Sequence, residues 1–137
     1  MCVILTEWLF TESVSILVDS SRDATRFAVE VQKIEAGIHV ATRGDLDLTT
    51  VQPLDAQLAS SVQEILNGPT EEQLILDLRD LVFIDSAGLA LLIKVSKELA
   101  ANGRVLRVTV AKGTQPERIL KIGHFDKILV LSYSLTD

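Results

Sequence analysis

The stretch LILDLRDLVFIDSAGL, residues 74–89, decides the fold of this chain. Its first part, Leu74–Leu78, is a mostly apolar run that suits a buried central strand. A turn is expected at Arg79-Asp80, and Leu81–Ile84 then forms a second apolar segment. The stretch continues through Asp85-Ser86-Ala87-Gly88 into apolar residues at helical spacing. A buried strand that leads directly into a helix is typical of an α/β domain.

Hydrophobic periodicity predicts the other elements on both sides of this stretch. Phe27, Val29 and Val31 alternate with more polar residues, which favours a half-buried strand. Helices are indicated by apolar faces, capping residues and closing glycines. The predicted elements are a strand from Phe27, a second strand over Ile38–Ala41, a loop over Gly44–Asp47, helices over about Val51–Leu66 and Ala87–Ala101, a strand over Leu106–Val110, a short helix between Thr114 and Gly123, and a strand over Ile128–Leu131. The order ββαβαβαβ predicts a mixed sheet with helices packed against it.

Length and composition indicate one domain with an additional N-terminal segment. A chain of 137 residues that is 47% hydrophobic can build a single core. Residues 27–137 are expected to form the domain, and residues 1–26 an apolar N-terminal extension. Residues 1–20 are too apolar to stay exposed, so they are expected to pack on the body or on a neighbouring copy, which would form a homodimer. The alternative is an unrelated strand added at the sheet edge.

Charge and cysteine content exclude several classes of function. The net charge of −6 disfavours nucleic acid and anionic membrane surfaces as partners. The apolar N-terminus has no Lys or Arg before Arg22, and no stretch is long enough to span a membrane, so a cytoplasmic protein is expected. Cys2 is the single cysteine, and His39 and His124 are far apart in the sequence. Neither a metal site nor a cofactor is therefore expected.

Two patterns suggest an enzyme, and neither is complete. Asp45-Leu46-Asp47-Leu48-Thr49 matches the D-x-D-x-T pattern of haloacid-dehalogenase-like phosphatases, a fold for which this chain is short. Nucleophilic aspartate chemistry also needs Mg²⁺, further acidic residues and a Lys. Ser86, His124 and Asp126 would make a hydrolase triad, but Ile84 stands where a nucleophile elbow requires its first Gly. A non-enzymatic protein is therefore favoured.

The segment Asp85-Ser86-Ala87-Gly88-Leu89 is the remaining candidate site. Its structural interpretation is a helix N-cap, in which Asp85 or Ser86 accepts hydrogen bonds from the first turn. Its functional interpretation is a contact site, because the small Ala87 and Gly88 would let a partner approach the Ser86 hydroxyl closely.

The same residues resemble a known family. Residues 76–89 are similar to the pattern D-L-x-x-V-x-F-[IM]-D-[ST]-[SA]-G-[LI] of STAS domains, in particular bacterial anti-sigma factor antagonists (anti-anti-sigma factors). Gly44-Asp45-Leu46-Asp47 resembles a second family element, G-[ED]-L-D, which precedes the first helix. The resemblance covers about residues 27–131. The chain departs from it in a longer N-terminal extension and in having only six residues, 132–137, where a final helix usually follows.

The resemblance implies a partner and a switch. In such systems the unphosphorylated antagonist binds an anti-sigma factor that is a serine kinase, a histidine-kinase-like ATPase, and thereby frees the sigma factor. The kinase phosphorylates the serine after the motif Asp, here Ser86, and a PP2C-type phosphatase reverses the reaction. Asp47, Asp85, Ser86, Ala87, Gly88 and Leu89 are the implied partner-binding residues, and the function implied is regulation of transcription, for example in a stress response.

Two other functions are weighed against this one. The first is a STAS scaffold or adaptor outside sigma control, such as a stressosome subunit or a transporter-associated module. Adaptors of that kind often lack the acceptor hydroxyl, which this chain has in Ser86. The second is a small Asp-dependent phosphatase, for which release of phosphate in the presence of Mg²⁺ is the discriminating assay.

Overall fold

The chain folds into one six-stranded sheet with helices packed against it. The computed structural model describes residues 13–17 and 27–133. The elements are β1 Ser13–Leu17, β2 Phe27–Ile34, β3 Gly37–Leu46, α2 Val51–Leu66, β4 Gln73–Ile84, α3 Ser86–Ala100, β5 Leu106–Val110, α4 Gln115–Ile122, the 3₁₀ helix η1 Phe125–Lys127 and β6 Val130–Tyr133. From β2 onward this is the predicted order, and it confirms the mixed α/β class.

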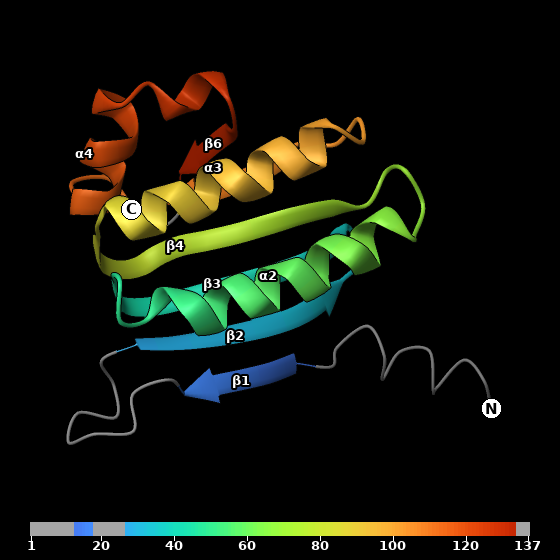
Figure 1. Cartoon of the computed structure of the whole chain (residues 1–137), viewed down its shortest axis with the longest axis horizontal. Coiled ribbons are helices and arrows are strands. Elements are labelled where there is room, and N and C mark those ends of the chain that lie inside the picture. Colours follow the sequence, from blue (N-terminus) through green and yellow to red (C-terminus); the bar gives the residue numbers. More distant parts are fainter. Residues whose placement is uncertain (1–12, 18–26, 134–137) are drawn as a thin grey trace.

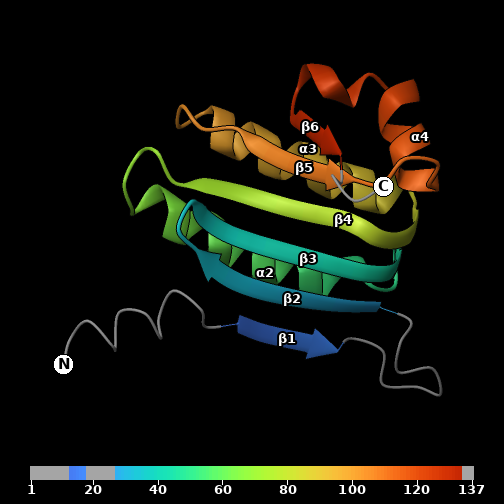
Figure 2. The ribbon, with the colours of Figure 1, turned by 180° about the vertical axis from the view of Figure 1, so that it is seen from behind.

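The strands follow one another across the sheet in the order in which they occur in the chain. β1, β2 and β3 pair antiparallel, and β3, β4, β5 and β6 pair parallel. Helices α2 and α3 lie side by side on one face of the sheet (Figure 1). Figure 2 looks onto the opposite face and shows the strands in front of these two helices. The carboxyl ends of β3 and β4 therefore meet at one edge of the sheet, beside the starts of α2 and α3.

The core lies between the sheet and these two helices. One face of α2 buries Leu54, Leu58, Val62 and Ile65, as the sequence pattern predicts. The α3 face buries Leu92, Val95 and Leu99. They pack against fully buried strand residues, among which are Val40, Leu76 and Val108. Burial of this many aliphatic side chains, at about 25 cal/mol per Å² of apolar surface, is the main stabilising contribution to the domain.

β3 and β4 are longer than the sequence pattern predicts. No turn occurs at Arg79-Asp80, because β4 runs without interruption over 12 residues, and Gly44–Leu46 belong to β3 rather than to a loop. The register between the two strands shifts between Ala41 and Arg43 and again between Gly44 and Asp45, and each shift inserts one extra residue in β4. Such bulges change which side chains face the core. The two predictions were wrong because the bulges break the two-residue alternation that marks a strand.

Part of the N-terminal extension is an edge strand. β1 pairs with β2, with Ser13 opposite Gln32 and Leu17 opposite Ala28. A strand at the sheet edge is the alternative prediction for this apolar segment. Residues 1–12 and 18–26 lie outside the described residues, and so does any contact that they make with the body or with a neighbouring copy.

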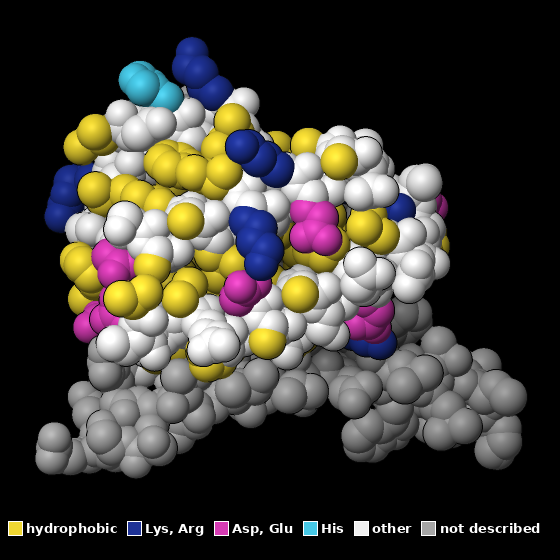
Figure 3. Space-filling model, in the orientation of Figure 1, with side chains coloured by type: hydrophobic (Ala, Val, Ile, Leu, Met, Phe, Trp, Pro, Cys, Tyr) yellow, Lys and Arg dark blue, Asp and Glu magenta, His cyan; other side chains and the backbone are white. Residues whose placement is uncertain are grey.

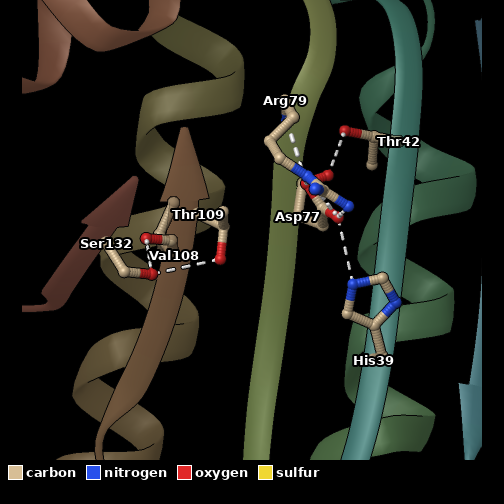
Figure 4. A network of polar contacts seen from close by, with 7 residues as sticks. All are labelled: His39, Thr42, Asp77, Arg79, Val108, Thr109 and Ser132. Carbon is tan, nitrogen blue, oxygen red and sulfur yellow. Dashed lines mark hydrogen bonds and ion pairs between the residues drawn. The ribbon is translucent and has the colours of Figure 1, made fainter. Parts of the chain in front are cut away.

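β6 is short and is attached to β5 by side chains as well as by its backbone. It begins at Val130 rather than at Ile128, because the backbone N–H groups of Ile128 and Leu129 donate to the carbonyl oxygen of Phe125 in η1 and so do not pair with a strand. The hydroxyl groups of Ser132 and Thr109 are 3.1 Å apart, and Ser132 Oγ donates to the carbonyl oxygen of Val108 at 3.4 Å (Figure 4). These contacts hold a strand of four residues at the end of the sheet.

A buried carboxylate on β4 holds the first bulge in place. Asp77 is 5% exposed. Its Oδ2 accepts hydrogen bonds from Arg79 Nη2 at 2.7 Å and pairs with His39 Nε2 at 3.0 Å, while its Oδ1 accepts from the Arg79 backbone N–H at 3.0 Å (Figure 4). Thr42 Oγ1 donates to the Asp77 carbonyl oxygen at 3.3 Å. Burial opposes ionisation of Asp77, but the hydrogen bonds from His39 and Arg79 outweigh it and hold the pKa of Asp77 well below its usual range. His39 is therefore part of the contacts that hold Asp77.

Asp77→Asn is expected to lower the free energy of unfolding by about 2 kcal/mol at pH 7, the size of a charge-assisted hydrogen bond. The pKa of Asp77 is lower in the folded than in the unfolded chain. Its charge therefore stabilises the fold above the unfolded pKa of about 3.9, and this contribution is lost as the pH falls below that value. Denaturant unfolding at pH 7 and near pH 3 measures the effect, with the exposed Asp80→Asn as control. An equal loss at both pH values would contradict it.

Candidate functional site

Two turns at the carboxyl edge of the sheet are joined by hydrogen bonds. One connects β3 to α2 through residues 47–50, and the other connects β4 to α3 through Asp85 alone. The Asp85 backbone N–H donates to the Leu46 carbonyl oxygen at 3.1 Å. In the other direction, the Leu48 backbone N–H donates to Asp85 Oδ2 at 3.2 Å. The two sequence motifs therefore form one surface, in which Asp85 contacts both turns.

Asp85 is the N-cap of α3, as the structural interpretation of this segment predicts. Its backbone is extended, with φ of −110°, and its Oδ1 accepts hydrogen bonds from the backbone N–H groups of Ala87 at 2.9 Å and Gly88 at 3.1 Å. One carboxylate oxygen thus caps the helix while the other binds Leu48. Because both oxygens are engaged, the end of β4 and the start of α3 have one defined conformation.

Ser86 is the first residue of α3, and its side chain is exposed. Asp85 takes the capping role, so the Ser86 hydroxyl is not needed to start the helix. Among the residues that the structure describes, none forms a hydrogen bond with this hydroxyl. The site therefore presents an accessible hydroxyl group at the positive end of the α3 dipole.

Asp47 organises the neighbouring turn. Its Oδ1 accepts hydrogen bonds from the Thr49 backbone N–H at 2.9 Å and from Thr49 Oγ1 at 2.6 Å. Thr50 is the N-cap of α2 by position, but its hydroxyl donates to the Asp45 carbonyl oxygen at 2.8 Å and accepts from the Asp47 backbone N–H at 2.9 Å. The hydroxyl groups of Thr49 and Thr50 thus hold the turn and do not cap the N–H groups of α2.

The small residues after Ser86 serve the packing of α3. Ala87 and Leu89 are half-buried, and Gly88 is buried. A Cβ atom at Gly88 would lie 2.7 Å from Ile84 Cγ1 and 3.0 Å from Leu46 Cγ, so only glycine lets α3 approach the ends of β3 and β4 this closely. The small size of Gly88 was predicted to admit a partner, whereas the neighbours of its Cα atom are the core residues Ile84 and Leu46.

Gln115 is a site-positioning residue that the sequence analysis missed. Its Oε1 accepts from the Ile84 backbone N–H at 2.9 Å, and its Nε2 donates to the Ile84 carbonyl oxygen at 3.0 Å. β5 pairs with β4 only over Leu74–Asp77, so the amide of Gln115 takes the place of a neighbouring strand just before Asp85. No sequence signal reveals this contact, because a glutamine at a helix start is ordinary.

Among the residues that the structure describes, neither enzyme pattern forms a complete catalytic site. Gln115 at the start of α4 contacts Ile84, two residues before Ser86. The exposed His124 lies beyond the other end of this helix, which has eight residues and is about 12 Å long. The Asp126 side chain lies outside the described part of the molecule. In the D-x-D-x-T pattern, Asp45 lies in β3 and Asp47 binds Thr49. Within the described ranges, no group of three acidic, His or Cys side chains is placed to hold a metal ion.

The surface around Ser86 combines acidic and apolar side chains. Asp45, Asp47 and Asp85 are the charged residues of the segments 45–50 and 85–90. Figure 3 shows hydrophobic side chains on the left of the molecule, over the starts of α2 and α3 and over α4. Leu48, whose backbone N–H binds Asp85, is 75% exposed. An exposed apolar side chain with a polar rim is typical of a protein-binding surface.

The fold and the site together define an α/β domain with an accessible serine at the start of a helix on the carboxyl edge of its sheet. The family model of the STAS domain matches residues 28–137. The chain belongs to the STAS domain family, which confirms the family resemblance of the two sequence motifs.

Solved structures show the same fold. An anti-sigma factor antagonist from Mycobacterium paratuberculosis is 20% identical, with a TM-score of 0.70 over 85% of this chain and 94% of the other. The anti-sigma factor antagonist SpoIIAA in its unphosphorylated form is 17% identical, with a TM-score of 0.57 over 79% and 90% of the two chains. The Bacillus cell fate determinant SpoIIAA in its phosphorylated form is 16% identical, with a TM-score of 0.53 over 76% and 90%.

Of the helices in the described part of the chain, none has the length and apolar character needed to cross a membrane.

Proposed function

We propose that this protein is an anti-sigma factor antagonist that is switched at Ser86. In its unphosphorylated form it binds an anti-sigma factor, a histidine-kinase-like serine kinase, and thereby frees a sigma factor for transcription in the cytoplasm. Phosphorylation of Ser86 releases the complex, and a PP2C-type phosphatase restores binding. The observation that carries the proposal is the exposed Ser86 hydroxyl, which is unneeded as a helix cap and lies on a surface shaped by Asp47 and Asp85. Two solved relatives of similar fold are named anti-sigma factor antagonists.

The position of Ser86 makes a phosphate compatible with the fold. A phosphoserine carries a charge of about −1.5 to −2 at neutral pH. At the start of α3 this charge meets the positive end of the helix dipole and the N–H groups of the first turn, both of which favour an anion. SpoIIAA, a protein of the same fold, is known in both phosphorylated and unphosphorylated forms. Phosphorylation is therefore expected to leave the domain folded.

The same phosphate is unfavourable for a bound partner. It adds negative charge beside Asp85, whose carboxylate already lies between the two turns. A partner that packs against this surface would have to desolvate the phosphate and accommodate its volume. The modification thus breaks the complex through the interface rather than through unfolding. ATP and Mg²⁺ belong to the kinase, so this chain needs no catalytic residue or cofactor of its own.

Incubation with candidate anti-sigma factor kinases and ATP tests the proposal directly. Mass spectrometry is expected to find one phosphate, on Ser86. Phosphate on another residue alone, such as Ser132, would refute the assignment. A chain that binds no such kinase and accepts no phosphate would instead be a STAS scaffold or adaptor. The homodimer through residues 1–20 stays a separate prediction.

Asp47→Asn is expected to slow phosphorylation of Ser86 or weaken partner binding, with little change in melting temperature. The amide oxygen of Asn can still accept the hydrogen bonds from Thr49, so the turn is retained while the charge presented beside Ser86 is lost. Phosphorylation kinetics and thermal unfolding of the same preparation measure both effects. A large fall in melting temperature with unchanged phosphorylation would make Asp47 a structural cap alone.

A further inference from the structure

Leu48 lies between Asp47 and Thr49 in the turn that adjoins Ser86, and its side chain is 75% exposed. Among large hydrophobic residues of the described chain this is the highest exposure, and Ile122 at the far end of α4 is comparable at 74%. A single exposed leucine on a surface is ordinary. The backbone contacts of Leu48 make it different.

Hydrogen bonds fix the turn on both sides of Leu48. The Leu48 backbone N–H donates to Asp85 Oδ2, and the preceding Asp47 N–H donates to Thr50 Oγ1. The following Thr49 is bound through both its N–H and its hydroxyl to Asp47 Oδ1. An exposed apolar side chain is thus presented on a backbone that is already ordered. Ordering of a loop is one of the main costs of association, and a turn of this kind avoids it.

The surroundings of Leu48 indicate what kind of partner fits. Asp45, Asp47 and Asp85 are the only charged residues of the two segments that form the site, and all three are acidic. An apolar side chain within an acidic rim complements an apolar pocket edged by Lys or Arg.

We propose that Leu48 is the apolar anchor of the interface, inserted into a pocket with a basic rim on the anti-sigma factor. This inference rests on the proposed function and adds the residue that supplies affinity. The same residue Asp85 holds Leu48 through its Oδ2 and starts the helix of Ser86 through its Oδ1. A phosphate on Ser86 therefore introduces its charge next to the anchor, in the area that must lose water when the pocket closes on Leu48.

Leu48→Ser tests the anchor, with Val105→Ser as matched control. Val105 is 56% exposed and precedes β5 at the opposite edge of the sheet, where Leu106 pairs with Leu74. Calorimetric titration of the unphosphorylated protein into the anti-sigma factor is expected to show binding weakened about tenfold or more for Leu48→Ser, the range expected for loss of one buried leucine. Val105→Ser is expected to bind like the wild type, and both variants to keep the wild-type melting temperature.

A kinetic readout separates an anchor from a structural role. Leu48→Ser is expected to raise the KM of the kinase for this protein and to leave kcat unchanged, because the hydroxyl that reacts is intact. Wild-type affinity in Leu48→Ser would overturn the anchor and leave the proposed function standing. Absence of binding by the wild type itself would overturn the proposed function, and with it the anchor.

Discussion

Ser86→Ala is expected to bind the anti-sigma factor constitutively, whether or not ATP is supplied, while Ser86→Asp or Ser86→Glu weakens binding. The Ala variant loses only an exposed hydroxyl that no described residue uses, so its fold and interface are retained. The acidic variants place a permanent charge at the first position of α3, next to Asp85. An extra carboxylate there is compatible with the helix dipole, but it costs free energy to desolvate when a partner docks.

Binding measured with and without ATP, together with thermal unfolding of each variant, tests this expectation. Wild type is expected to lose affinity after incubation with kinase and ATP, and Ser86→Ala to keep it. Equal melting temperatures would show that the switch acts at the interface. Loss of binding by Ser86→Ala, or ATP-dependent release of that variant, would show that another residue is the switch.

Gly88→Val is expected to lower the free energy of unfolding by about 3 kcal/mol, the upper part of the range for overpacked cores. A Cβ atom alone would lie 2.7 Å from Ile84 Cγ1, and the two additional methyl groups of Val have to fit between α3 and the ends of β3 and β4. Replacement of a helical glycine normally stabilises a helix by up to about 1 kcal/mol, which is too little to offset the clash. Because α3 has to move, the presentation of Ser86 is expected to suffer as well.

Ala90→Val is the control for this variant, since it adds the same two methyl groups at an exposed position of the same helix. Its cost is expected to be limited to the lower helix propensity of valine, about 0.5 kcal/mol. Chemical denaturation of both variants gives the comparison. A Gly88→Val protein as stable as Ala90→Val would show that the contact with Ile84 and Leu46 relaxes without cost.

Local patterns in the sequence were sufficient to predict most of the fold. The bounds of α2, Val51–Leu66, agree with the prediction, because its apolar face, its early proline and its closing Asn-Gly are all local signals. The turn expected at Arg79-Asp80 was wrong for the opposite reason. The bulges in β4 depend on how the strand pairs with β3, and a register shift between distant segments leaves no local pattern beyond a change of spacing.

The site shows the same division between local and distant signals. Asp85 as the cap of α3, and the short connection that exposes Ser86, could be inferred from a few adjacent residues. The roles of Leu48 and Gln115 could not be inferred in this way. Leu48 is held by the carboxylate of Asp85, 37 positions away, and Gln115 binds the backbone of Ile84, 31 positions away. Contacts of this kind appear only once the parallel strands have brought their carboxyl ends together.

The strands lie across the sheet in the order in which they occur in the chain, and this order has a consequence for folding during synthesis. Each strand pairs with the one synthesised immediately before it, and none is inserted between two strands already in place. A nascent chain emerging from the ribosome can therefore extend its sheet one strand at a time, with α2 and α3 each packing against the two strands that they connect. Both turns beside Ser86 are complete once α3 has emerged. Only the hydrogen bonds between Gln115 and Ile84 form later, after α4 has been synthesised.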